Sequence, residues 1–214
     1  MEKEREEQVI SLCQKLIQQK SYSGEESGVV GVLSENMKQM GFDEVTVDKY
    51  GNIIGCIKGN RPGKKVLFDG HIDTVPVTEE AEWLYPPFAA EIHDGKIYGR
   101  GTSDMKGAVA AMTCAASNYA KDTGKDFAGE IYVAGVVHEE CFEGVAAREI
   151  SKNVRPDYVV IGEASQLNLK IGQRGRAEII IETFGKPCHS ANPEKGINAV
   201  YKMAKVIGAI RTLA

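Results

Sequence analysis

Three mainly apolar runs constrain the fold of this 214-residue chain more than any other feature. They lie at 64–68, 131–137 and 158–161, and their apolar residues do not alternate with polar ones. Strands that are apolar on both faces belong inside a sheet that is covered on both sides, usually a parallel one. Helical stretches are expected between the runs, at about 105–120 and 143–151. This alternation predicts an α/β fold with three layers, a mostly parallel sheet flanked by helices.

The residues before the first run predict two helices and two strands. Apolar residues at three- and four-residue spacing indicate an amphipathic helix around 9–17, and a second helix is expected to end at Gly41. Ser23 and Glu26 have the spacing of a capping box for this second helix. The segment 44–59 then predicts two strands on either side of a turn at 50–52.

The pattern changes near Gln166. Two β-rich runs flank Gly172–Gly175, and a helix follows with Val200, Met203 and Ile207 on one face. This order predicts the first part of a small α+β domain. We therefore expect a catalytic domain at 1–166 and the beginning of a second domain at 167–214.

Composition excludes several classes of function. The chain has 26 Lys and Arg against 30 Asp and Glu, a net charge of −4, which gives no electrostatic reason to bind nucleic acid or acidic lipid. No apolar run has the length of a membrane span, and the N-terminus lacks the apolar core of a secretion signal. A cytoplasmic protein with a small-molecule or peptide substrate is expected.

Polar side chains gather where the apolar strands end. The first run leads into His71 and Asp73, the second into Glu139 and Glu140, and the third into Glu163. In open α/β sheets, ligands bind beyond the carboxyl ends of the strands. These five residues are therefore expected at one rim of the sheet.

A further acid, Asp104, lies in the glycine-rich turn GRGTSDMKG. Imidazole and carboxylate ligands suit zinc, and also cobalt or manganese. Several acids at one rim would repel each other unless cations lay among them. Taken singly, each residue is more often a surface or capping residue; the convergence of four such elements favours a metal site.

Five motifs in order resemble one family of metal-dependent enzymes. They are DGHIDTVP (69–76), YGRGTSDMKG (98–107), HEECFEG (138–144), IGEAS (161–165) and GKPCHSANPEKGINA (185–199). The chain resembles the zinc metallopeptidases and deacylases that include acetylornithine deacetylase, succinyl-diaminopimelate desuccinylase, aminoacylase and glutamate carboxypeptidase. The resemblance implies a hydrolase that cuts amide bonds of peptides or N-acyl amino acids.

The resemblance also implies roles for particular residues. His71 and Glu163 would hold one of two divalent metal ions, Glu140 the second, and Asp104 would bridge them. Asp73 would hydrogen-bond the other ring nitrogen of His71, and Glu139 would be the general base.

For the second domain, the resemblance implies a ferredoxin-like lid that forms a homodimer. His189 would there reach the site of a second copy and stabilise the oxyanion. The alternative role is that of a loop histidine beside Ser190.

Relatives are expected to be longer and to supply a late histidine to the second metal, whereas all four histidines here lie at or before position 189. The chain would then be C-terminally truncated and weakly active or inactive by itself. An alternative is a non-catalytic fragment that serves as an assembly or binding module. A serine hydrolase is disfavoured, because Met105 replaces the glycine that a nucleophile elbow needs two residues after Ser103.

Overall fold

The computed structural model describes residues 2–142, 144–175 and 177–213. The chain divides into two compact units, Met1–Asn168 and Leu169–Ala214. Among the described residues, no helix is both long enough and apolar enough to cross a bilayer.

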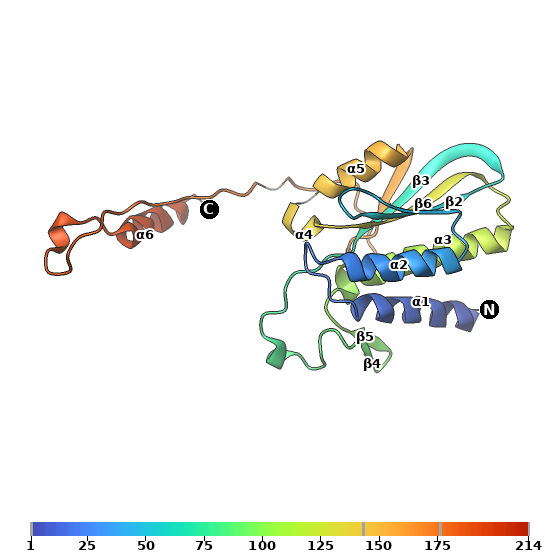
Figure 1. Cartoon of the computed structure of the whole chain (residues 1–214), viewed down its shortest axis with the longest axis horizontal. Coiled ribbons are helices and arrows are strands. Elements are labelled where there is room, and N and C mark those ends of the chain that lie inside the picture. Colours follow the sequence, from blue (N-terminus) through green and yellow to red (C-terminus); the bar gives the residue numbers. More distant parts are fainter. Residues whose placement is uncertain (1, 143, 176, 214) are drawn as a thin grey trace. The chain divides into compact units, whose positions relative to one another are not determined.

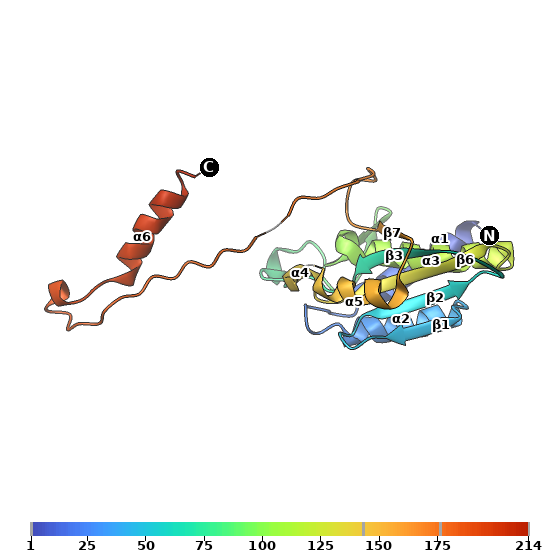
Figure 2. The ribbon, with the colours of Figure 1, turned by 90° about the horizontal axis from the view of Figure 1, so that it is seen from above.

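The first unit contains a five-stranded sheet in the order β1-β2-β6-β3-β7 (Figure 2). Its strands are β1 (Glu44–Val47), β2 (Ile53–Lys58), β3 (Arg61–His71), β6 (Ala128–Val136) and β7 (Tyr158–Ile161). Strands β6, β3 and β7 are parallel, whereas β1 and β2 join the sheet by antiparallel pairing. The predicted α/β class is confirmed; the sheet is mixed because the 44–59 hairpin adds its two strands to one edge.

Helices cover both faces of this sheet. On one face lie α1 (Glu2–Ile17), α2 (Ser27–Gln39) and α3 (Gly107–Thr123), and on the other lies α5 (Val145–Val154) (Figure 1). The core between them includes fully buried Leu16, Leu33, Ile53 and Val133. The three-layer arrangement therefore follows from the apolar faces of helices and strands, as the sequence pattern predicted.

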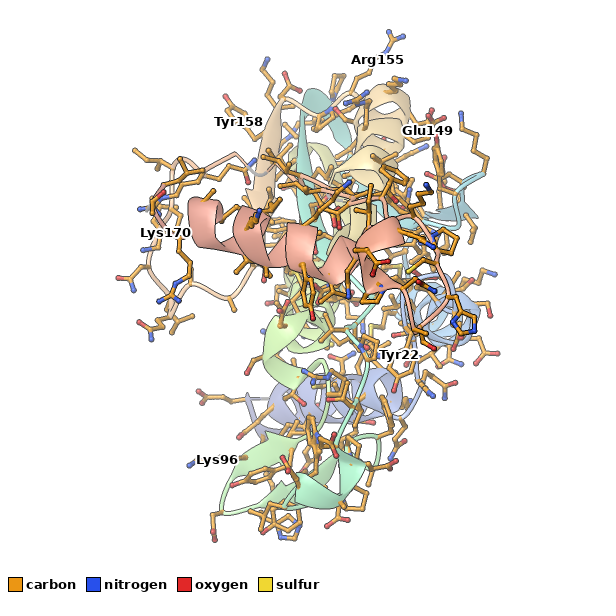
Figure 3. All side chains as sticks on the ribbon, turned by 90° about the vertical axis from the view of Figure 1, so that its left-hand side faces the viewer. Tyr22, Lys96, Glu149, Arg155, Tyr158 and Lys170 are labelled. Carbon is orange, nitrogen blue, oxygen red and sulfur yellow. The ribbon has the colours of Figure 1, made fainter. Side chains whose placement is uncertain are left out.

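Two smaller elements complete the first unit. The hairpin of β4 (Glu91–His93) and β5 (Lys96–Tyr98) precedes α3, and the short helix α4 (Glu139–Phe142) directly follows β6. At the outer edge, β7 pairs only with β3 within the described residues, and its first residue, Tyr158, is labelled in Figure 3.

The register of the parallel strands brings their carboxyl ends to one rim. His71 of β3 lies beside Val136 of β6, and Asp69 of β3 lies beside Ile161 of β7. The segments that continue from these strands therefore leave the sheet at the same place.

The second unit contains α6 (Ala199–Ile210), which confirms the predicted helix. The two strands predicted on either side of Gly172–Gly175 are not formed: residues 167–175 and 177–185 have no strand pairing. A strand requires a neighbour to exchange backbone hydrogen bonds, and the described residues place none beside these segments. Their apolar side chains, such as Ile171, Ile179 and Ile180, are exposed.

Candidate metal centre at the carboxyl ends of the strands

His71 ends β3 and is almost completely buried, with 3% of its surface exposed. Its Nδ1 lies 3.0 Å from the main-chain carbonyl oxygen of Asp73. A carbonyl oxygen can only accept, so Nδ1 carries the proton and donates it. The ring therefore presents Nε2 to the rim, the atom that would bind a metal.

The contact with Asp73 differs in one respect from the sequence prediction. The carboxylate of Asp73 was expected to bind the imidazole, but its Oδ1 lies 3.6 Å from Nδ1, farther than the carbonyl oxygen. This carboxylate, fully buried, instead accepts the backbone N–H groups of Glu139 and Glu140, each at 3.1 Å, and the hydroxyl of Ser23 at 2.6 Å. Burial opposes its ionisation, but the nearby imidazole of His71 and the hydrogen bonds from Ser23 and the backbone outweigh burial and lower the pKa of Asp73.

Asp104 reaches His71 from an irregular turn, Thr102–Lys106, in which the peptide bond between Asp104 and Met105 is cis. The end of the turn is anchored by Lys106, fully buried, whose Nζ donates to the carbonyl oxygens of Leu16 at 3.1 Å and Gln19 at 2.8 Å. This anchoring leaves Asp104 Oδ1 2.8 Å from Nε2 of His71.

Met105, also in this turn, packs against β3 at Gly70. A Cβ atom at Gly70 would lie 2.6 Å from Cε of Met105. A larger residue at Gly70 would therefore force the end of the Met105 side chain to shift.

The remaining carboxylates come from the ends of β6 and β7. One potential ligand atom from each of His71, Asp104 and Glu140 lies within 4.8 Å of the others. Nε2 of His71 is also 4.0 Å from Oε2 of Glu139 and 3.7 Å from Oε2 of Glu163. All five residues expected at the strand ends, together with Asp104, therefore meet at one rim.

At this rim a single imidazole faces several carboxylates, so negative charge is in excess. Burial raises the pKa of Glu139, and Glu140 and Glu163 raise it further, although His71 opposes them. Burial also raises the pKa of Glu140, with a further contribution from Asp104. Burial lowers the pKa of His71, but hydrogen bonds with Asp73 and Asp104 raise it to about 10. Cations would relieve this repulsion, and the donor set fits zinc, cobalt or manganese.

His189 belongs to the other compact unit, where it is exposed and its Nδ1 accepts the backbone N–H of Ala191 at 3.2 Å. Its expected role at a second copy's site stays a prediction. Within the described residues, neither of the other two histidines belongs to a group of three potential metal ligands. Nε2 of His93 lies 2.7 Å from Oε2 of Glu91. His93 stacks on Tyr85 with ring centroids 3.8 Å apart, and His138 approaches Glu26, its Nδ1 3.7 Å from Oε1.

The capping box predicted at Ser23 and Glu26 is wrong. Helix α2 begins at Ser27 and makes no side-chain capping hydrogen bond. Ser23 instead donates to Asp73, and Oε1 of Glu26 accepts the N–H groups of Gly24 at 2.9 Å and His138 at 3.1 Å. The spacing of Ser23 and Glu26 fits a capping box, but their observed partners Asp73 and His138 lie far away in the sequence.

Fold and rim together define an α/β protein with a candidate metal centre at the carboxyl ends of its strands. The family model described as "Peptidase family M20/M25/M40" matches residues 67–212. This match covers more than half of the chain, and the chain belongs to that family. The family comprises metal-dependent hydrolases of the peptidase and desuccinylase type.

Among curated relatives, "Uncharacterized protein YgeY" of Escherichia coli strain K12 is 38% identical over 196 residues, which cover 91% of this chain and 48% of the relative. Succinyl-diaminopimelate desuccinylase 2 of Ruegeria sp. strain TM1040 is 32% identical over 201 residues, 88% of this chain and 50% of the relative. The chain thus spans about half the length of these relatives.

Among solved structures, the M20 family metallo-carboxypeptidase Sso-CP2 from Sulfolobus solfataricus matches with a TM-score of 0.70 and 21% identity, covering 93% of this chain and 48% of that one. Human carnosine dipeptidase 1 matches with a TM-score of 0.60 and 24% identity, covering 73% of this chain and 38% of that one. At these identities, the likeness establishes the fold.

Proposed function

We propose that this chain carries the metal-binding part of a hydrolase that cleaves amide bonds of peptides or N-acyl amino acids. The observation that carries the proposal is the meeting of one buried imidazole, His71, with the carboxylates of Asp104 and Glu140 at the rim of the sheet. Family membership supports the same chemistry.

Two divalent cations, most simply zinc, would bind at this rim. His71 and Glu163 would hold the first cation, Glu140 the second, and Asp104 would bridge them. Bound cations of this kind lower the pKa of water and polarise an amide carbonyl. Asp73 contributes by fixing His71 through its carbonyl oxygen and the start of α4 through its carboxylate.

Glu139 is the proposed general base. Its side chain is partly exposed, with 36% of its surface accessible, and its Oε2 faces His71 at 4.0 Å. The raised pKa of Glu139 suits a group that takes a proton from the attacking water and returns it to the leaving nitrogen. The C–N bond breaks as the new C–O bond forms, and the products are an amine and a carboxylic acid.

The substrate class and the second unit are proposed from the relatives. A desuccinylase among the curated relatives supports an N-acyl amino acid, and the dipeptidase among the solved structures is consistent with a short peptide. The unit Leu169–Ala214 would form a lid and a homodimer contact, with His189 stabilising the oxyanion at the site of a second copy.

A titration with Co²⁺ tests the metal-binding part directly, because cobalt accepts the same ligands as zinc and absorbs visible light when bound. We expect the chain to bind Co²⁺, and the Glu140→Gln variant to bind it more weakly with an altered spectrum. His93→Ala is the matched control and should bind as the wild type does.

Hydrolysis of dipeptides and of N-acetyl and N-succinyl amino acids tests the reaction, with a cobalt- or zinc-loaded version completed to the length of the curated relatives. This chain by itself should hydrolyse them weakly or not at all. Absence of bound metal under zinc supplementation would overturn the proposal and favour the non-catalytic binding module instead. Metal binding that survives replacement of both His71 and Glu140 would also contradict it, because the site would then lie elsewhere.

A further inference from the structure

The turn between β6 and α4 is held almost entirely by side chains from other segments. Four consecutive backbone N–H groups donate to side-chain oxygens: those of residues 137 and 138 in the turn, and those of 139 and 140, the first two residues of α4. The N–H of Val137 donates to Oδ1 of Asn52 at 3.0 Å, and the N–H of His138 donates to Oε1 of Glu26 at 3.1 Å. The carboxylate of Asp73 accepts the next two: Oδ1 from Glu139 and Oδ2 from Glu140, both at 3.1 Å.

This turn needs such support because its backbone is irregular. His138 has a φ of +57°, in the left-handed region that side chains other than glycine rarely adopt. Backbone donors that are removed from water and lack a regular partner must find another acceptor. All three acceptor residues are buried: Glu26 is 5% exposed, and Asn52 and Asp73 are fully buried.

The connection between α1 and α2, residues 18–26, supplies one of these acceptors and holds a second through a hydrogen bond. Glu26 accepts from His138, and Ser23 donates to Oδ2 of Asp73 at 2.6 Å. The connection is itself fastened to the end of β3: the hydroxyl of Ser21 donates to the carbonyl of Ile72 at 2.7 Å, and the N–H of Thr74 donates to the carbonyl of Ser21 at 2.9 Å.

Tyr22, labelled in Figure 3, forms a parallel bridge with Thr74 in the same connection. One short segment therefore contacts both the strand end that carries His71 and the turn that carries Glu139 and Glu140.

We propose that the connection between α1 and α2 positions Glu139 and Glu140 for metal binding and catalysis, with Glu26 and Ser23 as positioning residues. The inference rests on the proposed function, since it assigns the connection a role in the same site. Neither residue is one of the proposed metal ligands. Glu26 acts through the backbone of His138, and Ser23 acts through the carboxylate of Asp73.

The test compares Glu26→Ala with Glu26→Gln by Co²⁺ titration of the full 214-residue chain. Alanine removes the oxygen that accepts from Gly24 and His138, whereas the amide oxygen of glutamine can still accept both hydrogen bonds. Loss of partners behind the metal ligands weakens metal affinity by about 10- to 100-fold. We expect a loss of this size, with an altered visible spectrum, for alanine, and near-complete rescue for glutamine.

Glu25→Ala, at the exposed neighbouring position, is the matched control and should bind Co²⁺ as the wild type does. A purely structural role would lower the melting temperature of the alanine variant without changing the affinity or spectrum of its folded fraction. That result would overturn the inference.

The Ser23→Ala variant keeps the inference testable if Glu26→Ala does not fold. Ser23 is only partly buried, and its replacement removes one hydrogen bond to Asp73. We expect a weaker affinity that Ser23→Thr, which keeps the hydroxyl, restores; wild-type affinity in Ser23→Ala would contradict the inference. Failure of the proposed function gives a different result, because the wild-type chain would then bind no Co²⁺ at the rim.

Discussion

The two sides of the candidate metal centre are built in opposite ways. On the side of β3, His71 and Asp73 are buried, and hydrogen bonds with the protein fix both. On the other side, Asp104 and Glu163 have side chains that are 58% and 48% exposed. Burial, together with the neighbouring carboxylates, raises the pKa values of Glu139 and Glu140 on this side. Hydrogen bonds within the protein therefore hold the buried side, whereas the exposed side gathers the negative charge that the proposed cations would neutralise.

The largest effect is expected when Glu139, the proposed general base on the exposed side, is replaced. Because this chain by itself is expected to be weakly active or inactive, the variant is made in a version completed to the length of the curated relatives. There Glu139→Gln should lower kcat by about 100- to 10,000-fold, the usual contribution of a general base, while Co²⁺ or zinc content stays unchanged. Initial rates and bound metal are measured on the same sample. Glu140→Gln is the informative contrast, since it should lose metal as well as activity. Unchanged turnover in Glu139→Gln would remove Glu139 as the base.

His71→Ala tests whether the buried side of the centre supplies a metal ligand. The variant loses the imidazole, the only neutral nitrogen ligand of the proposed set, and we expect Co²⁺ affinity to fall by more than about 100-fold, beyond the loss of a supporting residue. Isothermal titration calorimetry provides the measurement, with His93→Ala as the control because His93 stacks on Tyr85 away from the cluster. Equal affinities in the two variants would mean that His71 is not a ligand.

Asp73→Asn should give a smaller effect. The amide keeps the shape of the side chain, but its nitrogen cannot accept a backbone N–H as the carboxylate oxygens do. We expect Co²⁺ affinity to fall by about 10- to 100-fold, with the protein still folded by circular dichroism. Asp94→Asn, in an exposed turn, is the control. Wild-type affinity in Asp73→Asn would show that the buried side is not needed to hold the ligands.

The smallest effect is expected at Asp69, where burial rather than repulsion between carboxylates raises the pKa. Burial raises the pKa of Asp69, in β3, to about 6. Because this value lies above that of an unfolded aspartate, about 3.9, the protonated side chain favours folding below pH 4 and this contribution is lost as the pH rises through 6.

In chelator-treated protein, Asp69→Asn should therefore gain about 1 to 1.5 kcal/mol in unfolding free energy relative to the wild type between pH 5 and pH 7.5. Urea unfolding at the two pH values measures this change. A difference between variant and wild type that does not vary with pH would contradict the assignment to burial.

The sequence predicted the strands and the rim of the first unit well, because the patterns that indicate them lie within short stretches of the chain. The apolar runs before His71, Glu139 and Glu163 identified central strands, and the rule that ligands bind beyond strand ends placed these residues at one rim. Asp104 was harder to place by this rule, because it lies in a turn after a small hairpin. The glycine-rich motif around it supplied the signal.

The parts that sequence analysis did not predict depend on distant partners. Ser23 and Glu26 have the spacing of a helix cap, and the same side-chain oxygens serve equally well as partners for Asp73 and for the backbone of His138. Similarly, the residues on either side of Gly172–Gly175 have strand composition, but composition does not provide the neighbouring strand that pairing requires.

The central claim is that cations bind between the two sides of this rim. Crystals grown with zinc and measured at the zinc absorption edge test it most directly. The account predicts an anomalous peak about 2.0 to 2.2 Å from Nε2 of His71 and from a carboxylate oxygen of Asp104. A zinc ion bound elsewhere, with no peak between these two side chains, would contradict it.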